Sequence, residues 1–203
     1  MRIILVRHAL TDWNMEERCH GITDVPLGEY GKAMAIKLAE PIGRQKFDAI
    51  YCSNLLRAKM TLDLMMGIEM PAIVTDTRLR ERDFGKMEGN THRRGMELWP
   101  EEVSAWLADH TYTMEGGETY DAFTDRVQDF IKQILRDCEG KTVLIVAHGG
   151  SLRAILRYLG NRFGTVGIDS FISHACYADL EILGNKMTVR DLNNCEHLRE
   201  LEK

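Results

Sequence analysis

Short apolar runs in this 203-residue chain predict the strands of a sheet. The strongest are residues 3–6 and 142–147, which are almost entirely apolar and rich in β-branched side chains. Such runs are typical of parallel strands that are buried on both faces. Weaker patterns predict strands at residues 47–52 and 72–74, and a closing hairpin formed by residues 175–183 and 186–192.

Apolar residues at helical spacing lie between these strands. The pattern is clearest over residues 119–138, where one face carries Tyr120, Phe123, Val127, Phe130, Ile131, Ile134 and Leu135. Shorter helices are predicted at residues 30–40, at 101–108, at 54–66 with Ser53 as the N-cap, and after His148 as far as Leu159. Strands that alternate with helices predict an α/β fold with a mostly parallel sheet.

Residues 83–117 have a different composition from the rest of the chain. They contain Gly85, Gly89, Gly95, Pro100, Gly116 and Gly117, with only short helical pieces between them. We predict that this segment is a small inserted cap, because no repeat, low-complexity tract or long linker marks a domain boundary. Residues 1–203 are therefore predicted to form a single domain.

The composition excludes some partners. The net charge of −5 gives no reason to expect nucleic acid or an anionic membrane surface, and no window is long and apolar enough to span a bilayer. The apolar run after Met1 is too short for the core of a signal peptide. The five cysteines are odd in number and widely spaced, without a C-x-x-C pair. We therefore expect neither a disulfide framework nor a zinc site, and a cytoplasmic location.

Charged and titratable side chains follow each predicted parallel strand. Arg7 and His8 follow the first strand, Arg57 the second, Glu81 the third and His148 the fourth. Each residue alone has an ordinary explanation, such as a solvated helix position or a surface carboxylate. The carboxyl ends of parallel strands share one edge of a sheet, however, which is where α/β folds bind ligands. Their joint occurrence therefore predicts a common site.

This combination of groups suits a phosphate monoester. Arginine binds the dianion with two parallel hydrogen bonds, and Arg57 in the first turn of a helix suggests a bound anion that offsets the helix dipole. The glycines after His148 allow backbone N–H groups to approach a ligand closely. A neutral imidazole can attack phosphorus, and a carboxylic acid can protonate the departing alkoxide.

The same residues carry a family resemblance. The segment Leu5-Val-Arg-His-Ala-Leu-Thr-Asp-Trp-Asn14 resembles the R-H-G-x-T-x-W-N signature of the histidine phosphatase superfamily, the phosphoglycerate-mutase-like proteins. The likeness continues in order through Asp24-Val-Pro-Leu27, 47–53 with Arg57, 79–85 with Glu88-Gly89, Gly116-Gly-Glu118 and Val146-Ala-His-Gly-Gly150. It therefore extends over nearly the whole chain.

The resemblance implies a three-layer α/β/α fold and a phosphohistidine intermediate on His8. Arg7, Arg57 and His148 would clamp the phosphate, with Asn14 and the backbone of Gly149 completing the pocket. Glu81 would be the proton donor. No metal or other cofactor is implied, and the expected partner is a small phosphorylated metabolite.

Some residues depart from the family pattern. Ala9 stands where relatives usually have glycine, Leu10 where a polar residue is common, and Gly28 where Ser or Thr usually caps a helix. His174 begins a His-Ala-Cys turn in place of an Asn-Ala-Ser-like one, so it is expected either to line the substrate mouth or to be an ordinary loop histidine. Within the cap, Arg93 and Arg94 are either solvated residues outside a small satellite core, or one of them faces the substrate.

Several functions fit the resemblance. The mutases are usually longer and carry a Glu-Arg-His-Tyr-Gly-like run, whereas this chain has Glu81-Arg-Asp-Phe-Gly85, which favours a small-molecule phosphatase. α-Ribazole-phosphate phosphatase and sugar-phosphate phosphatase are both plausible. A phosphoglycerate mutase is the alternative enzyme, and a non-catalytic phosphate-sensing or protein-binding member is the alternative outside catalysis. The sequence leaves a monomer and a homodimer equally open.

Overall fold

The computed structural model describes residues 1–66, 71–165, 168 and 170–201. Within this part of the chain, six strands form one sheet in the order β3-β2-β4-β1-β5-β6. The strands are β1 (Arg2–Arg7), β2 (Ala49–Ser53), β3 (Ile73–Asp76), β4 (Thr142–Ala147), β5 (Tyr177–Leu183) and β6 (Lys186–Asn194). The first four in this order run parallel, whereas β5 pairs antiparallel with both β1 and β6. The predicted mostly parallel sheet is confirmed.

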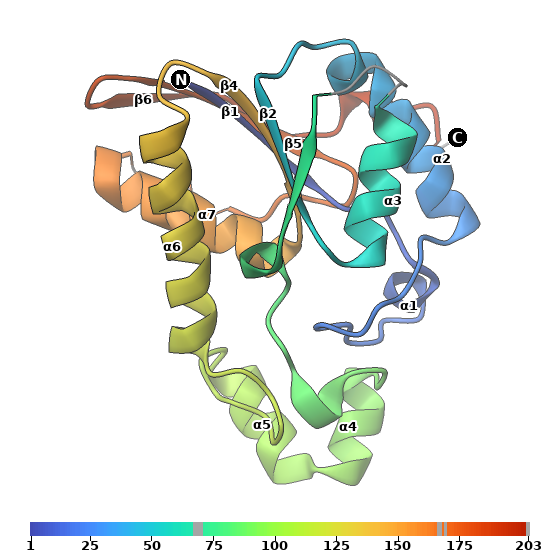
Figure 1. The fold of residues 1–203 in the computed structure, drawn as a ribbon. Coiled ribbons are helices and arrows are strands. Elements are labelled where there is room, and N and C mark those ends of the chain that lie inside the picture. The colour runs from blue at the N-terminus through green and yellow to red at the C-terminus, as the bar shows by residue number, and fades with distance from the viewer. Residues whose placement is uncertain (67–70, 166–167, 169, 202–203) are drawn as a thin grey trace.

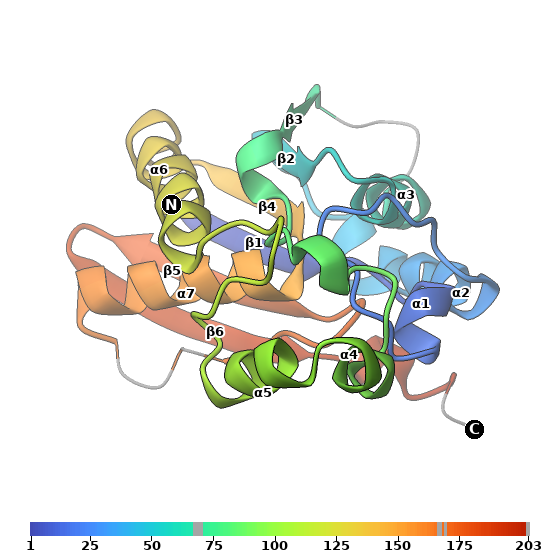
Figure 2. The ribbon, with the colours of Figure 1, turned by 90° about the horizontal axis from the view of Figure 1, so that it is seen from below.

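The helices cover both faces of the sheet. They are α1 (Asp12–Met15), α2 (Glu29–Lys37), α3 (Leu56–Met65), α4 (His92–Leu98), α5 (Pro100–Ala108), α6 (Tyr120–Asp137) and α7 (Gly149–Phe163). Short 3₁₀ turns lie at Thr77–Leu79, Gly85–Met87 and Glu196–Leu198, and a π-helical turn at Ala39–Gly43. Figures 1 and 2 show α2 and α3 together on one side of the sheet and α6 and α7 on the other, which is the expected three-layer fold.

The apolar side chains that predicted the central strands and the long helix α6 form the buried core. The side chains of Ile3 to Val6 and Val143 to Ala147 are completely buried, because β1 and β4 occupy the middle of the sheet. Phe123, Val127, Phe130, Ile131 and Ile134 of α6 are buried on the face that periodicity predicted. None of the helices in the described ranges has the length and hydropathy of a bilayer span.

The cap, with α4 and α5, lies below the sheet in Figure 1. Its helices α4 and α5 enclose a small core of Met87, Val103 and Met114, against which Trp99 and Trp106 pack. The buried Arg82 holds the C-terminal segment of the cap, because its guanidinium donates to the carbonyls of His110, Tyr112 and Glu118, among others. The predicted insertion is therefore a structured unit beside the sheet edge.

Two predictions about individual residues are wrong. Ser53 does not cap α3, which begins at Leu56 with Leu55 as N-cap; Ser53 ends β2 and its hydroxyl is hydrogen-bonded to His148. The expectation that the cysteines form no disulfide framework is also wrong for one pair, because Cys176 and Cys195 form a disulfide while Cys19, Cys52 and Cys138 are free. The cysteine pattern therefore no longer supports the prediction of a cytoplasmic location.

Candidate active site

His8 is a buried histidine at the carboxyl end of β1. It follows β1 directly and is 4% exposed. Its Nδ1 lies 2.7 Å from the carbonyl oxygen of Ala9, and because a carbonyl only accepts, Nδ1 carries the proton. Burial, reinforced by the positive charge of Arg57, holds the pKa of His8 well below its ordinary value. The ring is therefore neutral, with an unprotonated Nε2 on its other side.

Ala9 is accommodated in place of the family glycine. Its φ is not positive, its side chain is completely buried, and its N–H donates to Thr61 Oγ1 at 3.0 Å. The Thr61 hydroxyl in turn donates to the carbonyl of Arg57 at 2.7 Å. This chain of hydrogen bonds fixes the turn carrying His8 to the helix that carries Arg57.

Two arginines supply the positive charge, Arg7 half-buried and Arg57 buried. Arg7 ends β1 and donates from Nη1 to the carbonyl of Ile172 at 3.0 Å. Arg57 is 1% exposed near the start of α3, and its two terminal nitrogens donate to the carbonyls of Thr23 and Gly21 at 2.9 and 2.7 Å. Burial lowers the pKa of each guanidinium to about 10, so both remain cationic at neutral pH.

His148 lies beside His8. It is the N-cap residue of α7, it is completely buried, and its ring centre is 5.1 Å from that of His8. Its Nε2 is 2.8 Å from the hydroxyl of Ser53, which orients the ring. Burial, and then the charge of Arg57, lower the pKa of His148 well below its ordinary value. The imidazole is therefore neutral in the free site.

Unpartnered nitrogens converge on this site. Among the described residues, six buried side-chain polar atoms lack a hydrogen-bond partner, and four of them are Arg7 Nε, Arg57 Nε, His148 Nδ1 and His174 Nε2. A buried polar group without a partner costs stability, so such atoms are rare and need an explanation. Their clustering around His8 is explained if they bind an oxyanion.

Glu81 reaches the same edge of the sheet from the segment after β3. Its Oε2 accepts from the backbone N–H of Gly150 and its Oε1 from that of Arg82, both at 2.9 Å. A Cβ at Gly150 would lie only 2.2 Å from Glu81 Oε1, so the second glycine after His148 is what admits the carboxylate. Gly149 has a comparable role, because a Cβ there would lie 3.1 Å from Arg7 Cζ.

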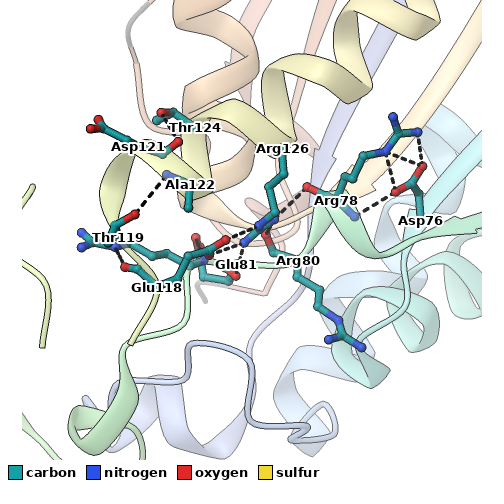
Figure 3. Close-up of polar contacts among 11 residues, drawn as sticks. Asp76, Arg78, Arg80, Glu81, Glu118, Thr119, Asp121, Ala122, Thr124 and Arg126 are labelled. Atoms are coloured by element: carbon teal, nitrogen blue, oxygen red, sulfur yellow. Dashed lines mark hydrogen bonds and ion pairs between the residues drawn. The ribbon is translucent and has the colours of Figure 1, made fainter. Parts of the chain in front are cut away.

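The backbone that leads to Glu81 is held by Arg126 of α6 (Figure 3). Its Nη1 donates to the carbonyls of Arg78 and Arg80 at 2.8 and 2.9 Å, and its Nη2 donates to the carbonyl of Glu81 at 2.9 Å. Glu118 clamps the same guanidinium with contacts of 2.6 and 2.7 Å. A bidentate pair of this kind fixes orientation, so the loop that presents Glu81 is rigidly placed.

Replacing Gly150 with alanine should therefore damage the site without damaging the fold. Alanine favours a helix over glycine by about 1 kcal/mol, whereas its Cβ must displace the Glu81 carboxylate. We expect the melting temperature to be unchanged or higher and the hydrolysis of alkyl phosphates to fall by about 10-fold or more. An alanine variant with wild-type activity on alkyl phosphates would show that the position of Glu81 is unimportant.

Asn14 lies in α1, and His20 lies in the loop that follows this helix. Asn14 forms a capping box with Thr11, whose N–H donates to Asn14 Oδ1 at 3.0 Å, so its role as a phosphate ligand stays a prediction. His20 was missed by the sequence analysis. Its Nε2 is 2.5 Å from Thr11 Oγ1, and burial followed by the charge of Arg57 lowers its pKa to about 4.

The residues expected to recognise the substrate lie in two different places: His174 lies next to His8, whereas Arg93 and Arg94 lie at the surface. His174 belongs to the loop before β5 and its ring centre is 5.2 Å from that of His8. Arg93 and Arg94, in contrast, have side chains that are 92% and 57% exposed, and both pair with Glu97. The structure therefore brings His174 to the centre but leaves the two cap arginines at the surface.

A pocket of about 440 Å³ opens next to Glu81. Most of its wall is apolar or aromatic, with contributions from the core and the cap: Phe84, Trp106, Leu107, Tyr120, Phe123 and Phe171. Gly150, Arg82, Arg153, His92 and His110 complete its lining. In the described part of the chain, no three His, Cys, Asp or Glu side chains are arranged to hold a metal ion.

Comparison with known proteins gives the family. The model of the histidine phosphatase superfamily (branch 1) matches residues 3–195. The chain belongs to this superfamily. Its members and structural neighbours identify it as an enzyme of the phosphatase and phosphoglycerate-mutase-like type.

Individual relatives of this histidine phosphatase are similar over most of its length. It is 37% identical over 158 residues to the metal-independent phosphoserine phosphatase of Arabidopsis thaliana, covering 75% of this chain and 66% of that protein. It is 30% identical over 198 residues to the uncharacterized phosphatase PhoE of Bacillus subtilis, and the match covers 97% of this chain and 96% of that protein. The structure of the α-ribazole phosphatase from Shigella flexneri superposes with a TM-score of 0.86 at 29% identity, and the match covers 96% of this chain and 97% of that one.

Proposed function

We propose that the protein hydrolyses small phosphate monoesters through a phosphohistidine on His8, with Glu81 as proton donor. The observation that carries this proposal is the set of unpartnered nitrogens of Arg7, Arg57 and His148 around a neutral imidazole. Three fixed donors match the three equatorial oxygens of a phosphoryl group in transfer. The two cations offset its charge without requiring a metal ion.

In the first step, the Nε2 lone pair of His8 attacks phosphorus while the ester P–O bond breaks. The electron pair of that bond goes to the leaving oxygen, which takes a proton from the Glu81 carboxylic acid. The products are a phosphoryl group on His8, a free alcohol and a Glu81 carboxylate. The hydrogen bond from Nδ1 to the Ala9 carbonyl supports the positive charge that the imidazole ring gains.

In the second step, water takes the place of the alcohol. The Glu81 carboxylate accepts a proton from the water, whose oxygen attacks phosphorus as the P–N bond breaks. The electron pair returns to His8 Nε2, and inorganic phosphate leaves. Both the free imidazole and the protonated carboxyl group are regenerated, so the cycle needs no other reactant.

The pocket beside Glu81 supports a substrate whose alcohol carries an apolar or aromatic body. Because Glu81 protonates the leaving oxygen, the alcohol must lie on its side of the phosphate, where Trp106, Tyr120 and Phe171 form the wall. Among substrates named for relatives, α-ribazole phosphate has a benzimidazole ring that suits such a wall. Phosphoserine has no apolar body of this kind.

A panel of phosphate monoesters tests this proposal. We expect kcat/KM for α-ribazole phosphate and naphthyl phosphate to exceed that for phosphoserine and glucose 6-phosphate by about 10-fold or more. Trp106→Ala should lower kcat/KM only for α-ribazole phosphate and naphthyl phosphate. The surface variant Arg93→Ala should leave kcat/KM for all four compounds unchanged. Equal rates on all four compounds would reject the apolar preference. The panel includes 3-phosphoglycerate with 2,3-bisphosphoglycerate, since isomerisation there would support a mutase instead.

A further inference from the structure

His174 occupies a position that the proposed mechanism does not use. Its ring meets that of His8 edge-on, with ring centres 5.2 Å apart. Its Nε2 is buried and has no hydrogen-bond partner, a property it shares with Arg7, Arg57 and His148. The three other residues with this property in the site are those expected to hold the phosphate. The same physical criterion therefore places His174 in their group.

The loop that carries His174 is anchored directly after this residue. The N–H of Ala175 donates to the carbonyl of His8 at 3.3 Å, and the carbonyl of Cys176 accepts from the N–H of Arg7 at 3.2 Å. The next link is the disulfide from Cys176 to Cys195. Ala175 has a φ of 53°, in the left-handed region that non-glycine residues rarely adopt. A loop held this firmly fixes its histidine rather than leaving it to solvent.

The charges around His174 also suit an anion contact. Burial, then the charge of Arg7 and further contributions from His20 and Arg57, lower the pKa of His174 to about 3. At neutral pH the ring is therefore neutral, and it can donate one hydrogen bond without adding another positive charge. The positive groups that disfavour an imidazolium here are the groups that attract a phosphate.

We propose that His174 is a further phosphate-binding residue, whose Nε2–H donates a hydrogen bond to the phosphoryl group opposite His148. This inference rests on the proposed function, because it assumes that the phosphate sits between the arginines and His8. It assigns His174 to the reaction centre rather than to the substrate mouth. The contact belongs to the phosphate and not to the alcohol, so its loss should affect all monoesters alike.

Two substitutions separate hydrogen bonding from packing. His174→Phe keeps a ring against His8 but has no donor, whereas His174→Gln keeps an N–H donor and loses the ring. A control is His197→Ala: His197 Nε2 donates to the carbonyl of Ala175 at 2.8 Å, so this change removes one contact to the loop but keeps the His174 side chain itself. Binding of inorganic phosphate by calorimetry and kcat/KM on two unrelated monoesters are measured for each, with melting curves to verify folding.

We expect His174→Phe to weaken phosphate binding and lower kcat/KM by about 10- to 100-fold, the loss typical of a hydrogen bond to a charged group. His174→Gln should recover much of this loss, and His197→Ala should stay within about threefold of the wild type. Wild-type phosphate binding by His174→Phe would overturn the inference and leave His174 a packing residue. Absence of phosphoenzyme in the wild type would instead refute the proposed function, and the inference with it.

Discussion

Replacing His8 with alanine should reduce the turnover of every phosphate monoester by more than about 10³-fold. The reason is that the proposed mechanism uses the unprotonated Nε2 of His8 as the nucleophile, and two of the neighbouring imidazoles are engaged in hydrogen bonds of their own. His148 is held by Ser53, and His20 by Thr11. The measurement is steady-state hydrolysis of an aryl phosphate, with the melting temperature as evidence that the variant folds.

Covalent labelling makes this prediction specific. Rapid acid-free quenching of the wild type with labelled substrate should trap a phosphoryl group that survives base and is lost in acid, as expected for a phosphohistidine. His8→Ala should trap none, whereas His197→Ala, which removes a histidine outside the centre, should label normally. If His8→Ala keeps a substantial fraction of the wild-type rate, the nucleophile is another group.

The strand-end positions of the main site residues could be predicted from sequence. His8 and His148 directly follow the two most apolar runs, and parallel strands bring their carboxyl ends together. Arg57 and Glu81 follow the neighbouring strands β2 and β3, so their approach to the same edge also follows from topology. In each case a short-range pattern fixed the strand, and the parallel sheet supplied the long-range contact.

His20 could not be found in this way, because its loop follows no strand or helix period. That loop is positioned by Glu88, whose carboxylate accepts from the N–H groups of Ile22 and Thr23 at 2.9 and 2.8 Å. A Cβ at Gly21 would meet the same carboxylate at 1.7 Å, which explains the glycine beside His20. These contacts join residues more than sixty positions apart and leave no periodic signal.

The disulfide was missed for a related reason. The hairpin around Gly184–Asn185 was predicted, and its inner pair is Leu183 with Lys186. A regular continuation from that pair would place Cys176 opposite Asn193. Irregularities in the ladder between Tyr177 and Leu180 shift the register by two residues, so that Tyr177 pairs with Asn194 and Cys176 lies opposite Cys195. Bulges depend on tertiary packing, and the alternation of side chains along a strand does not predict them.

Replacing Glu81 with glutamine should slow the enzyme to a degree that depends on the leaving group. Glutamine keeps the size of the side chain and an oxygen that can accept from the N–H of Gly150, so the fold should be preserved. It has no acidic proton to give to a departing alkoxide. Alkyl phosphates, whose alkoxides leave poorly, should lose about 10²–10⁴-fold in kcat, the usual contribution of a general acid. Nitrophenyl phosphate, whose phenolate leaves without protonation, should lose much less.

The comparison is made on one alkyl and one aryl phosphate of similar size, under single-turnover conditions that isolate formation of the phosphoenzyme. Dephosphorylation is followed separately, because the same carboxylate activates water in that step and its rate should fall for both substrates. Arg93→Ala, far from the reacting groups, is the matched control and should leave the ratio of the two rates unchanged. Equal losses in phosphoenzyme formation on both substrates would exclude Glu81 as the proton donor. Its carboxylate would then serve only to accept hydrogen bonds from the backbone N–H groups of Gly150 and Arg82.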